Sequence, residues 1–254
     1  MKIAVISDIH AYPAALDVAL KDAREQGAVR FGCLGDIVGY GPSPAEAVAL
    51  ARASFDIVVA GNHDAAVAQQ ISDRDFNRRA QKTVDVHRAE LAADARAWLA
   101  ALPRYCEEDV IAYAHGTVSR VFGRTVAGFG YVFTPETAEQ AFAALPPKVR
   151  VLFVGHTHEA CSWVKPEASA LPVECPPKDF TLDSNARYIV NVGSVGYPRS
   201  TRESTYVLFD TETNHVQFRR LHFDFADYHR QLTAHGINIP LWLEDHLARQ
   251  GMAC

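Results

Sequence analysis

Residues 1–10 read MKIAVISDIH, and the rest of the chain is interpreted from this stretch. Ile3 to Ile6 form an apolar run, which predicts a short strand buried on both faces. Asp8 and His10 follow at once, and in an extended backbone residues i and i+2 point to the same side. The spacing therefore predicts a carboxylate and an imidazole side by side where a core strand ends, a suitable pair of metal ligands. Taken alone, such a motif is more often a solvated Asp beside a surface His.

The composition of the 254-residue chain restricts the function classes. A formal net charge of −5, with acids and bases interspersed, argues against a surface that coats nucleic acid. No apolar run approaches the ~18–20 residues that span a bilayer, and the N-terminal run is too short for a secretory signal. The five cysteines are scattered, which indicates reduced thiols in a cytoplasmic protein. We therefore expect no membrane and no stable nucleic-acid partner.

The pattern of the first ten residues recurs along the chain. Apolar runs at 31–34, 58–59, 109–114 and 149–154 each end in a potential ligand. In open α/β sheets, ligands bind beyond the carboxyl ends of the strands, so these side chains are expected to converge. Two carboxylates, one amide and four imidazoles exceed the needs of one ion and suit two ions ~3.5–4 Å apart. The predicted ligands are Asp8, His10, Asp36, Asn62, His115, His156 and His158.

Each ligand motif also has a structural explanation when it is taken alone. Asp36 and Asn62 are residue types that often cap helices or form turns. His115 is typical of a hydrogen-bonded core imidazole. His156-x-His158 is the most informative piece, because packing rarely requires two alternating imidazoles. Taken together and in order, each after a strand, the motifs favour a metal site.

Helices are expected between the strands. Ser43 to Glu46 predict a helix start with a capping box, residues 65–102 predict two helices, and residues 119–130 predict a mobile loop. Early alternation of strand and helix predicts parallel pairing, and the later strands predict a second, more antiparallel sheet. We expect one domain over residues 1–254, with residues 224–254 as a helical tail packed on it.

Five blocks of the sequence together resemble the calcineurin-like metallophosphoesterases. They stand in the order of that family between residue 3 and about residue 196. Two further segments, 35–42 and 191–196, resemble the small bacterial single-domain branch, some of whose members resemble dinucleoside polyphosphate hydrolases. The resemblance implies an α/β (α+β) fold, a four-layer αββα sandwich of two mixed β-sheets flanked by helices. The blocks are Asp8-x-His10, Gly35-Asp36, Gly61-Asn62-His63-Asp64, His115-Gly116 and Gly155-His156-Thr157-His158.

The resemblance also implies residue roles. His63 acts on the substrate, and Asp64 orients it. Imidazole-rich ligation favours Mn, Fe, Zn, Ni or Co over Mg, and Mn is the ion expected to support activity. One metal ion is held by Asp8, His10 and His158, the other by Asn62, His115 and His156, and Asp36 bridges them.

These roles predict a metal-dependent phosphoric ester hydrolase, a phosphodiesterase or phosphatase. A hydroxide between two divalent ions would attack a small nucleotide-like phosphoester. A dinucleoside polyphosphate hydrolase is the alternative within the family. A catalytically silent scaffold on the same fold is the alternative of another class, and it would have little use for His63 beside a full ligand set. We expect a monomer or small homo-oligomer.

Weaker candidates lie outside the ligand blocks. Arg199 is expected to contact a substrate phosphate together with Asn62, although a surface salt bridge explains an arginine equally well. Tyr40 and Tyr197 either stack on a base or simply pack. Finally, the sequence places Arg120 and Arg124 in the predicted loop, where they close over a substrate or remain solvated.

Overall fold

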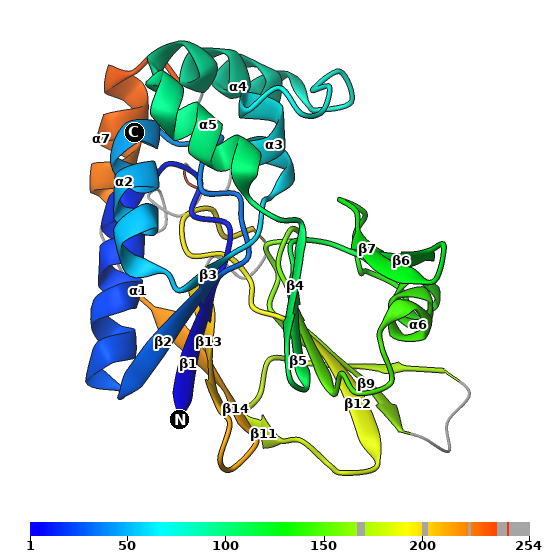
Figure 1. Cartoon of the computed structure of the whole chain (residues 1–254). Coiled ribbons are helices and arrows are strands. Elements are labelled where there is room, and N and C mark those ends of the chain that lie inside the picture. Colours follow the sequence, from blue (N-terminus) through cyan, green and yellow to red (C-terminus); the bar gives the residue numbers. More distant parts are fainter. Residues whose placement is uncertain (167–170, 200–202, 223–224, 238–242, 244–254) are drawn as a thin grey trace.

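Two six-stranded sheets lie against each other with helices outside them (Figure 1). The computed structural model describes residues 1–166, 171–199, 203–222, 225–237 and 243. The first sheet has the order β11-β14-β13-β1-β2-β3, and its pairs β1–β2 and β2–β3 are parallel. Its strands are β1 (Lys2–Ile6), β2 (Ala28–Cys33), β3 (Ile57–Val58), β11 (Phe180–Thr181), β13 (Ser204–Asp210) and β14 (His215–Leu221).

The second sheet has the order β10-β9-β12-β8-β5-β4. Strands β5, β8 and β12 run parallel, β4 and β9 flank them as antiparallel neighbours, and β10 pairs antiparallel with β9. The expectation that the late strands build a second sheet is wrong in one respect, because the β13–β14 hairpin joins the first sheet through β1. The strands are β4 (Tyr105–Glu108), β5 (Ile111–Ala114), β8 (Val151–Val154), β9 (Cys161–Pro166), β10 (Val173–Cys175) and β12 (Ala186–Asn191).

Alternate side chains of β1 face different layers. Ile3 and Val5 pack between the sheets, in a cluster that includes Phe153 of β8. Ala4 and Ile6 belong to the cluster beneath the helices of the first sheet. The predicted strand, buried on both faces, is therefore confirmed. The predicted αββα layering is confirmed as well, because helices cover the outer face of each sheet (Figure 1).

Helices α1 to α5 pack on the first sheet, and α6 packs on the second (Figure 1). In the cluster beneath the first sheet's helices, α1 buries Leu16 and Leu20. Residues 65–102 contain the two expected helices and also the end of a third. That third helix begins before this range, at Asn62. The helices are α1 (Pro13–Glu25), α2 (Pro44–Ser54), α3 (Asn62–Val67), α4 (Arg78–Glu90), α5 (Ala93–Ala101), α6 (Pro135–Ala144) and α7 (Phe225–Ala234).

The predicted mobile loop is a β-hairpin, so that expectation is wrong. Strands β6 (Val118–Val121) and β7 (Arg124–Ala127) pair with each other, and Gly123 turns between them at φ +77°. Val118 packs in the cluster that also contains residues of α6. Scattered glycines concealed this hairpin in the sequence pattern. Both Arg120 and Arg124 are exposed on it.

The start of α2 and the C-terminal tail differ in part from the expectations. Ser43 precedes α2 but makes no side-chain cap hydrogen bond, so the expected capping box is absent there. The tail forms α7, where Tyr228 stacks on Tyr12 with ring centroids 4.1 Å apart. Apart from residue 243, the expected helical tail beyond residue 237 lies outside the described residues. The extent of the domain stays a prediction. None of the described helices is long and apolar enough to cross a bilayer.

Candidate metal centre

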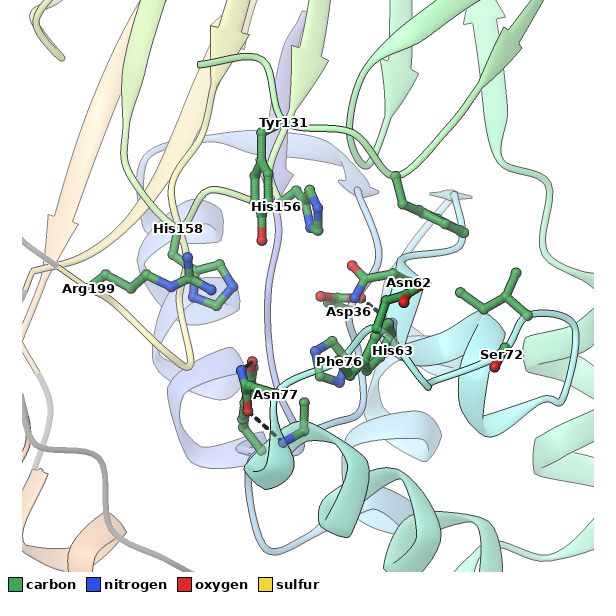
Figure 2. Close-up of a pocket in the computed structure, with 15 residues that line it drawn as sticks. Asp36, Asn62, His63, Ser72, Phe76, Asn77, Tyr131, His156, His158 and Arg199 are labelled. Atoms are coloured by element: carbon green, nitrogen blue, oxygen red, sulfur yellow. Dashed lines mark hydrogen bonds between the residues drawn. The ribbon is translucent and has the colours of Figure 1, made fainter. Parts of the chain in front are cut away.

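The predicted ligands meet at one end of the two sheets, and Figure 2 shows four of them around the adjoining pocket. The first sheet supplies residues after β1 and β2, and the second supplies residues after β5 and β8. Asn62 is the first residue of α3. The convergence predicted from the strand ends is therefore present in space. All seven side chains belong to buried residues: Asp8, His10, Asp36, Asn62, His115, His156 and His158.

Two groups of potential metal ligands share one carboxylate. Within each group the ligand atoms all lie within 4.8 Å of one another, and Asp36 belongs to both groups. Asn62 Oδ1 lies 3.1 Å from Nε2 of His115, so the amide adjoins the second group. The first group is Asp8, His10, Asp36 and His158, and the second is Asp36, His115 and His156.

Imidazole nitrogens face each other inside both groups. Nε2 of His10 lies 3.0 Å from Nε2 of His158, and Nε2 of His115 lies 3.0 Å from Nδ1 of His156. Oδ1 of Asp8 is buried, lies 3.1 Å from Nε2 of His158 and has no hydrogen bond within the described residues. Buried polar atoms without partners are costly, and a shared cation would satisfy these lone pairs together. The donor set therefore fits two divalent ions.

Backbone carbonyls orient three of the imidazoles. Nδ1 of His10 lies 3.2 Å from the carbonyl oxygen of Val38, Nδ1 of His115 lies 2.8 Å from that of Leu34, and Nδ1 of His158 lies 2.6 Å from that of Tyr197. A carbonyl oxygen only accepts, so each Nδ1 must carry the proton and donate it. The Nε2 lone pair of each ring is then directed into the centre, as metal ligation requires.

The backbone of most predicted ligands is left-handed. Their φ angles are 55° at Asp8, 50° at His10, 51° at Asp36, 67° at His156 and 62° at His158. Non-glycine residues rarely adopt such angles, and clusters of them mark functional sites. The alternation argument for Asp8 and His10 is therefore wrong in mechanism. β1 ends at Ile6, and a tight left-handed turn brings the two side chains together.

Two glycines permit close contact between the loops after β2 and β3. Gly35 has φ +92°, and a Cβ there would lie 2.2 Å from the backbone nitrogen of Gly61. Gly61 itself is extended, with φ −87° and ψ 173°. A Cβ on Gly61 would lie 2.1 Å from Oδ1 of Asp36. Lack of space for a side chain, rather than a special turn conformation, requires glycine at 61.

Burial and neighbouring charges shift the pKa values of the imidazoles and the carboxyl group in this centre in opposite directions. Burial lowers the pKa of His115, but the carboxylates of Asp36 and Asp8 outweigh it and raise the value to about 9. Burial raises the pKa of Asp36, but the facing imidazoles of His115 and His63 outweigh it and hold the value well below its usual range. Burial, together with His115, lowers the pKa of His156 to about 3. Without metal the centre therefore holds a proton on His115, which a divalent ion would have to displace.

His63 lies in the pocket beside this centre (Figure 2). Its backbone N–H donates to Oδ1 of Asp36 at 2.9 Å. Its ring lies between Tyr40 and Phe76, with centroid distances of 4.7 Å and 5.0 Å. Nδ1 is buried and has no partner within the described residues. Burial lowers the pKa of His63 to about 3, so the imidazole is neutral.

Asp64 does not orient His63 directly, which corrects that expectation. Its Oδ1 accepts from the backbone N–H groups of Ile37 and Val38 at 2.9 Å and 3.2 Å. Its Oδ2 accepts from that of Gly61 at 3.0 Å. Three backbone N–H groups thus donate to the Asp64 carboxylate. The carboxylate therefore links the loop after Asp36 to the start of α3. Asp64 positions the backbone on which His63 stands.

Two residues after β12 brace the ligand loops. Nδ2 of Asn191 donates to the carbonyl oxygen of Gly155 at 2.8 Å and to Oγ1 of Thr157 at 2.9 Å. Oγ of Ser194 donates to the carbonyl oxygen of Asp8 at 2.8 Å. Reasoning from residue chemistry did not assign these roles. The only signal was the resemblance of the segment 191–196 to a family block.

A pocket of ≈ 580 Å³ opens above the metal centre (Figure 2). Arg199 lines it, as expected of a substrate-contacting residue, and so do Asn62 and His63. Arg120 and Arg124 do not line it. Tyr40 lines the pocket, and its ring stacks on that of Tyr197 with centroids 4.5 Å apart.

Comparison with known proteins agrees with this geometry. An uncharacterized protein of Methanocaldococcus jannaschii is 29% identical over 254 residues, 96% of each chain. The crystal structure of a metallophosphoesterase from Sphaerobacter thermophilus is 31% identical and covers 98% of each chain with a TM-score of 0.78. A hypothetical protein from Pyrococcus horikoshii shares the fold at 20% identity, covering 97% of each chain with a TM-score of 0.68. Residues 1–214 match the calcineurin-like phosphoesterase superfamily domain, and the chain belongs to that superfamily.

Proposed function

We propose that this protein is a dinuclear-metal-dependent phosphoester hydrolase that acts on a small nucleotide-like phosphoester. The superfamily is metal-dependent, and its members are phosphoesterases. The observation that carries the proposal is that two ligand groups share Asp36 beneath a pocket that also contains His63. A scaffold protein would have little need for this arrangement.

The ligand groups define which residues would hold the ions. Asp8, His10 and His158 would hold one ion, and Asn62, His115 and His156 the other, with Asp36 shared. When bound, two divalent ions supply a hydroxide nucleophile near neutral pH and polarise the phosphoryl oxygens. The four imidazoles favour Mn, Fe, Co, Ni or Zn over Mg.

His63 stabilises the charge that develops on the substrate. Its backbone is held on Asp36, and its ring lines the pocket as a neutral imidazole. Its ring N–H can donate to a phosphoryl oxygen or to the leaving-group oxygen, and such a pre-oriented donor is most effective where water is excluded. Phe76 beside it and Phe129 opposite provide apolar walls that limit water.

The test compares wild-type protein with His63→Ala after loading with Mn. Wild type should hydrolyse bis-p-nitrophenyl phosphate or p-nitrophenyl phosphate, and the variant should lose roughly 10²–10⁴ in kcat while retaining its metal content. His235→Ala is the matched control, because it removes an exposed imidazole from the C-terminal side of α7. Inert wild type with Mn, Fe, Co, Ni and Zn would instead favour a binding protein on this fold, and a fully active His63→Ala would overturn the catalytic role of His63.

A dinucleoside polyphosphate hydrolase is the second candidate. Two arginines, Arg79 and Arg199, line a recess next to the metal centre, where they would suit a substrate with several phosphates. A substrate panel of dinucleoside polyphosphates, cyclic nucleotides and aryl esters, with metal analysis of the same sample, separates the two candidates.

A further inference from the structure

A second recess, of ≈ 590 Å³, opens beside the pocket of the metal centre. It shares four lining residues with that pocket, so a single extended ligand can occupy both. Its lining includes two guanidinium groups and, within the described residues, no carboxylate. The recess is lined by Tyr40, Asn77, Arg79, Tyr131, Tyr197 and Arg199.

The two guanidinium groups come from distant parts of the chain. Arg79 lies on α4 and donates from Nη1 to the hydroxyl of Tyr197 at 2.9 Å. Arg199 follows β12 and lies beside His158 at the edge of the pocket (Figure 2). Within the described ranges no salt bridge or hydrogen bond involves the Arg199 side chain. Its charge is therefore available to an anion in the recess.

The aromatic wall of the recess is rigidly built. Tyr40 stacks on Tyr197 with an interplanar angle of 15°, and Nδ2 of Asn77 donates to the Tyr40 hydroxyl at 3.1 Å. Tyr40 has a left-handed φ of 57°, which costs free energy unless the surroundings hold it. α4 supplies that support, because the Tyr40 backbone N–H donates to Oγ1 of Thr83 and that of Gly39 to Nδ1 of His87.

The recess borders both ligand groups, because Tyr131 in its lining stacks on His156 of the second group with ring centroids 4.1 Å apart. Tyr40 lies 4.9 Å from the ring of His10, and Tyr197 lies 5.5 Å from that of His158. The second group also has an apolar neighbour, because Phe129 lies 6.2 Å from the ring of His115. The recess therefore makes one side of the site cationic, and that side lies against both ligand groups.

We propose that this recess binds a second phosphate of the substrate, so that the preferred substrates are nucleotides with two or more phosphates. The inference rests on the proposed function, because it assumes that the first phosphate lies at the metal centre. Arginine forms paired, charge-assisted hydrogen bonds with phosphate, and the start of α4 at Asn77 adds a weaker positive potential. A mononucleotide would leave this cationic side unused.

The test measures equilibrium binding rather than turnover. Calorimetry compares AMP, ADP and adenosine 3′,5′-bisphosphate on Mn-loaded protein in the His63→Ala background, where the ligands are not consumed. ADP or the bisphosphate should bind about tenfold or more tightly than AMP, as expected for one added arginine–phosphate contact. Arg199→Ala should abolish that gain, so that ADP and AMP bind with similar affinity, and Arg199→Lys should restore part of it.

Arg120→Ala is the matched control, because it removes one positive charge from the exposed β6–β7 hairpin outside the recess. It should retain the full gain. The inference is overturned if neither bisphosphorylated ligand binds more tightly than AMP, or if Arg199→Ala keeps the gain. Failure of the proposed function would appear differently, as wild-type protein that hydrolyses no phosphoester although the gain is present.

Discussion

Asp36 is the residue on which both ligand groups depend. Its Oδ2 lies 3.3 Å from Nε2 of His115 and 3.7 Å from Nε2 of His10, so one oxygen faces both groups. Its Oδ1 accepts the backbone N–H of His63 and thereby fixes the start of α3. A single side chain thus joins the metal centre to the residue expected to contact the substrate.

Replacing this carboxylate should impair both metal sites at once. We expect Asp36→Asn to lose most of its bound divalent metal, because the amide removes the negative charge shared by the two groups. Elemental analysis after dialysis against Mn measures the effect. Asp17→Asn, which neutralises an exposed carboxylate on α1, should bind as much metal as wild type. Equal metal content in the Asp36 and Asp17 variants would contradict the shared-ligand geometry.

At the scale of elements, helix starts differ although their sequences are similar. Thr134 caps α6, and its side chain accepts from the backbone N–H of Thr137. Ser43 precedes α2 without such a bond. Both helices begin with proline and carry an acidic residue in the first turn. Local sequence therefore predicts where each helix begins, but not whether the capping bond forms.

This difference can be measured by alanine substitution. Thr134→Ala should lower the free energy of unfolding by about 1 kcal/mol, the usual cost of losing a cap. Ser43→Ala should change it by only a few tenths of a kcal/mol, because no side-chain bond is lost. Urea denaturation of the two variants decides the matter, and equal losses would show that Ser43 caps α2 in solution.

α4 supports the loop that carries Tyr40 through a buried imidazole. Nδ1 of His87 accepts from the backbone N–H of Gly39 at 3.0 Å, and its Nε2 donates to the carbonyl oxygen of Gly41 at 2.9 Å. Burial lowers the pKa of His87 to about 4. The role of His87 in the fold is therefore structural.

The lowered pKa of His87 makes stability depend on pH. The folded value of about 4 lies below the unfolded value of 6.5, so its contribution is complete above pH 6.5 and is lost as pH falls toward 4. The loss is on the order of 3 kcal/mol. The free energy of unfolding of metal-free His87→Gln should therefore fall less steeply over this range than that of wild type. If the free energies of unfolding of His87→Gln and wild type fell in parallel with pH, this role would be excluded. The control, His235→Gln, should follow wild type.

At the scale of the whole molecule, the candidate metal centre lies between loops of the two sheets. Asp8, His10 and Asp36 follow strands of the first sheet, whereas His115, His156 and His158 follow strands of the second. Ions held between them would bind the folded chain and not the unfolded chain, so they should stabilise the two sheets as a unit. The apolar cluster between the sheets has the same role without metal.

Metal addition should therefore raise the melting temperature. At free Mn about 100 times Kd, binding contributes about 2.7 kcal/mol, or roughly 5–10 °C for a chain of this size. Differential scanning calorimetry with and without a chelator measures the shift. Asp36→Asn should show little of it, and an equal shift in that variant would mean that Mn acts elsewhere.

The predicted ligands and their order along the chain were identified from the sequence alone. Short apolar runs predicted buried strands, and the residues that follow them supplied the donor set, because both signals are local. The same local signals failed where glycines interrupted the pattern, as in the hairpin at 118–127, and they misjudged the backbone of Asp8 and His10.

Only the tertiary structure decided which distant segments meet. The pairing of β13 with β1 and the recess that brings Arg79 to Arg199 join residues more than 100 positions apart. The left-handed turns at the ligands likewise persist because neighbouring loops hold them. Contacts of this kind depend on how whole layers pack, so they cannot be predicted from residue spacing along the chain.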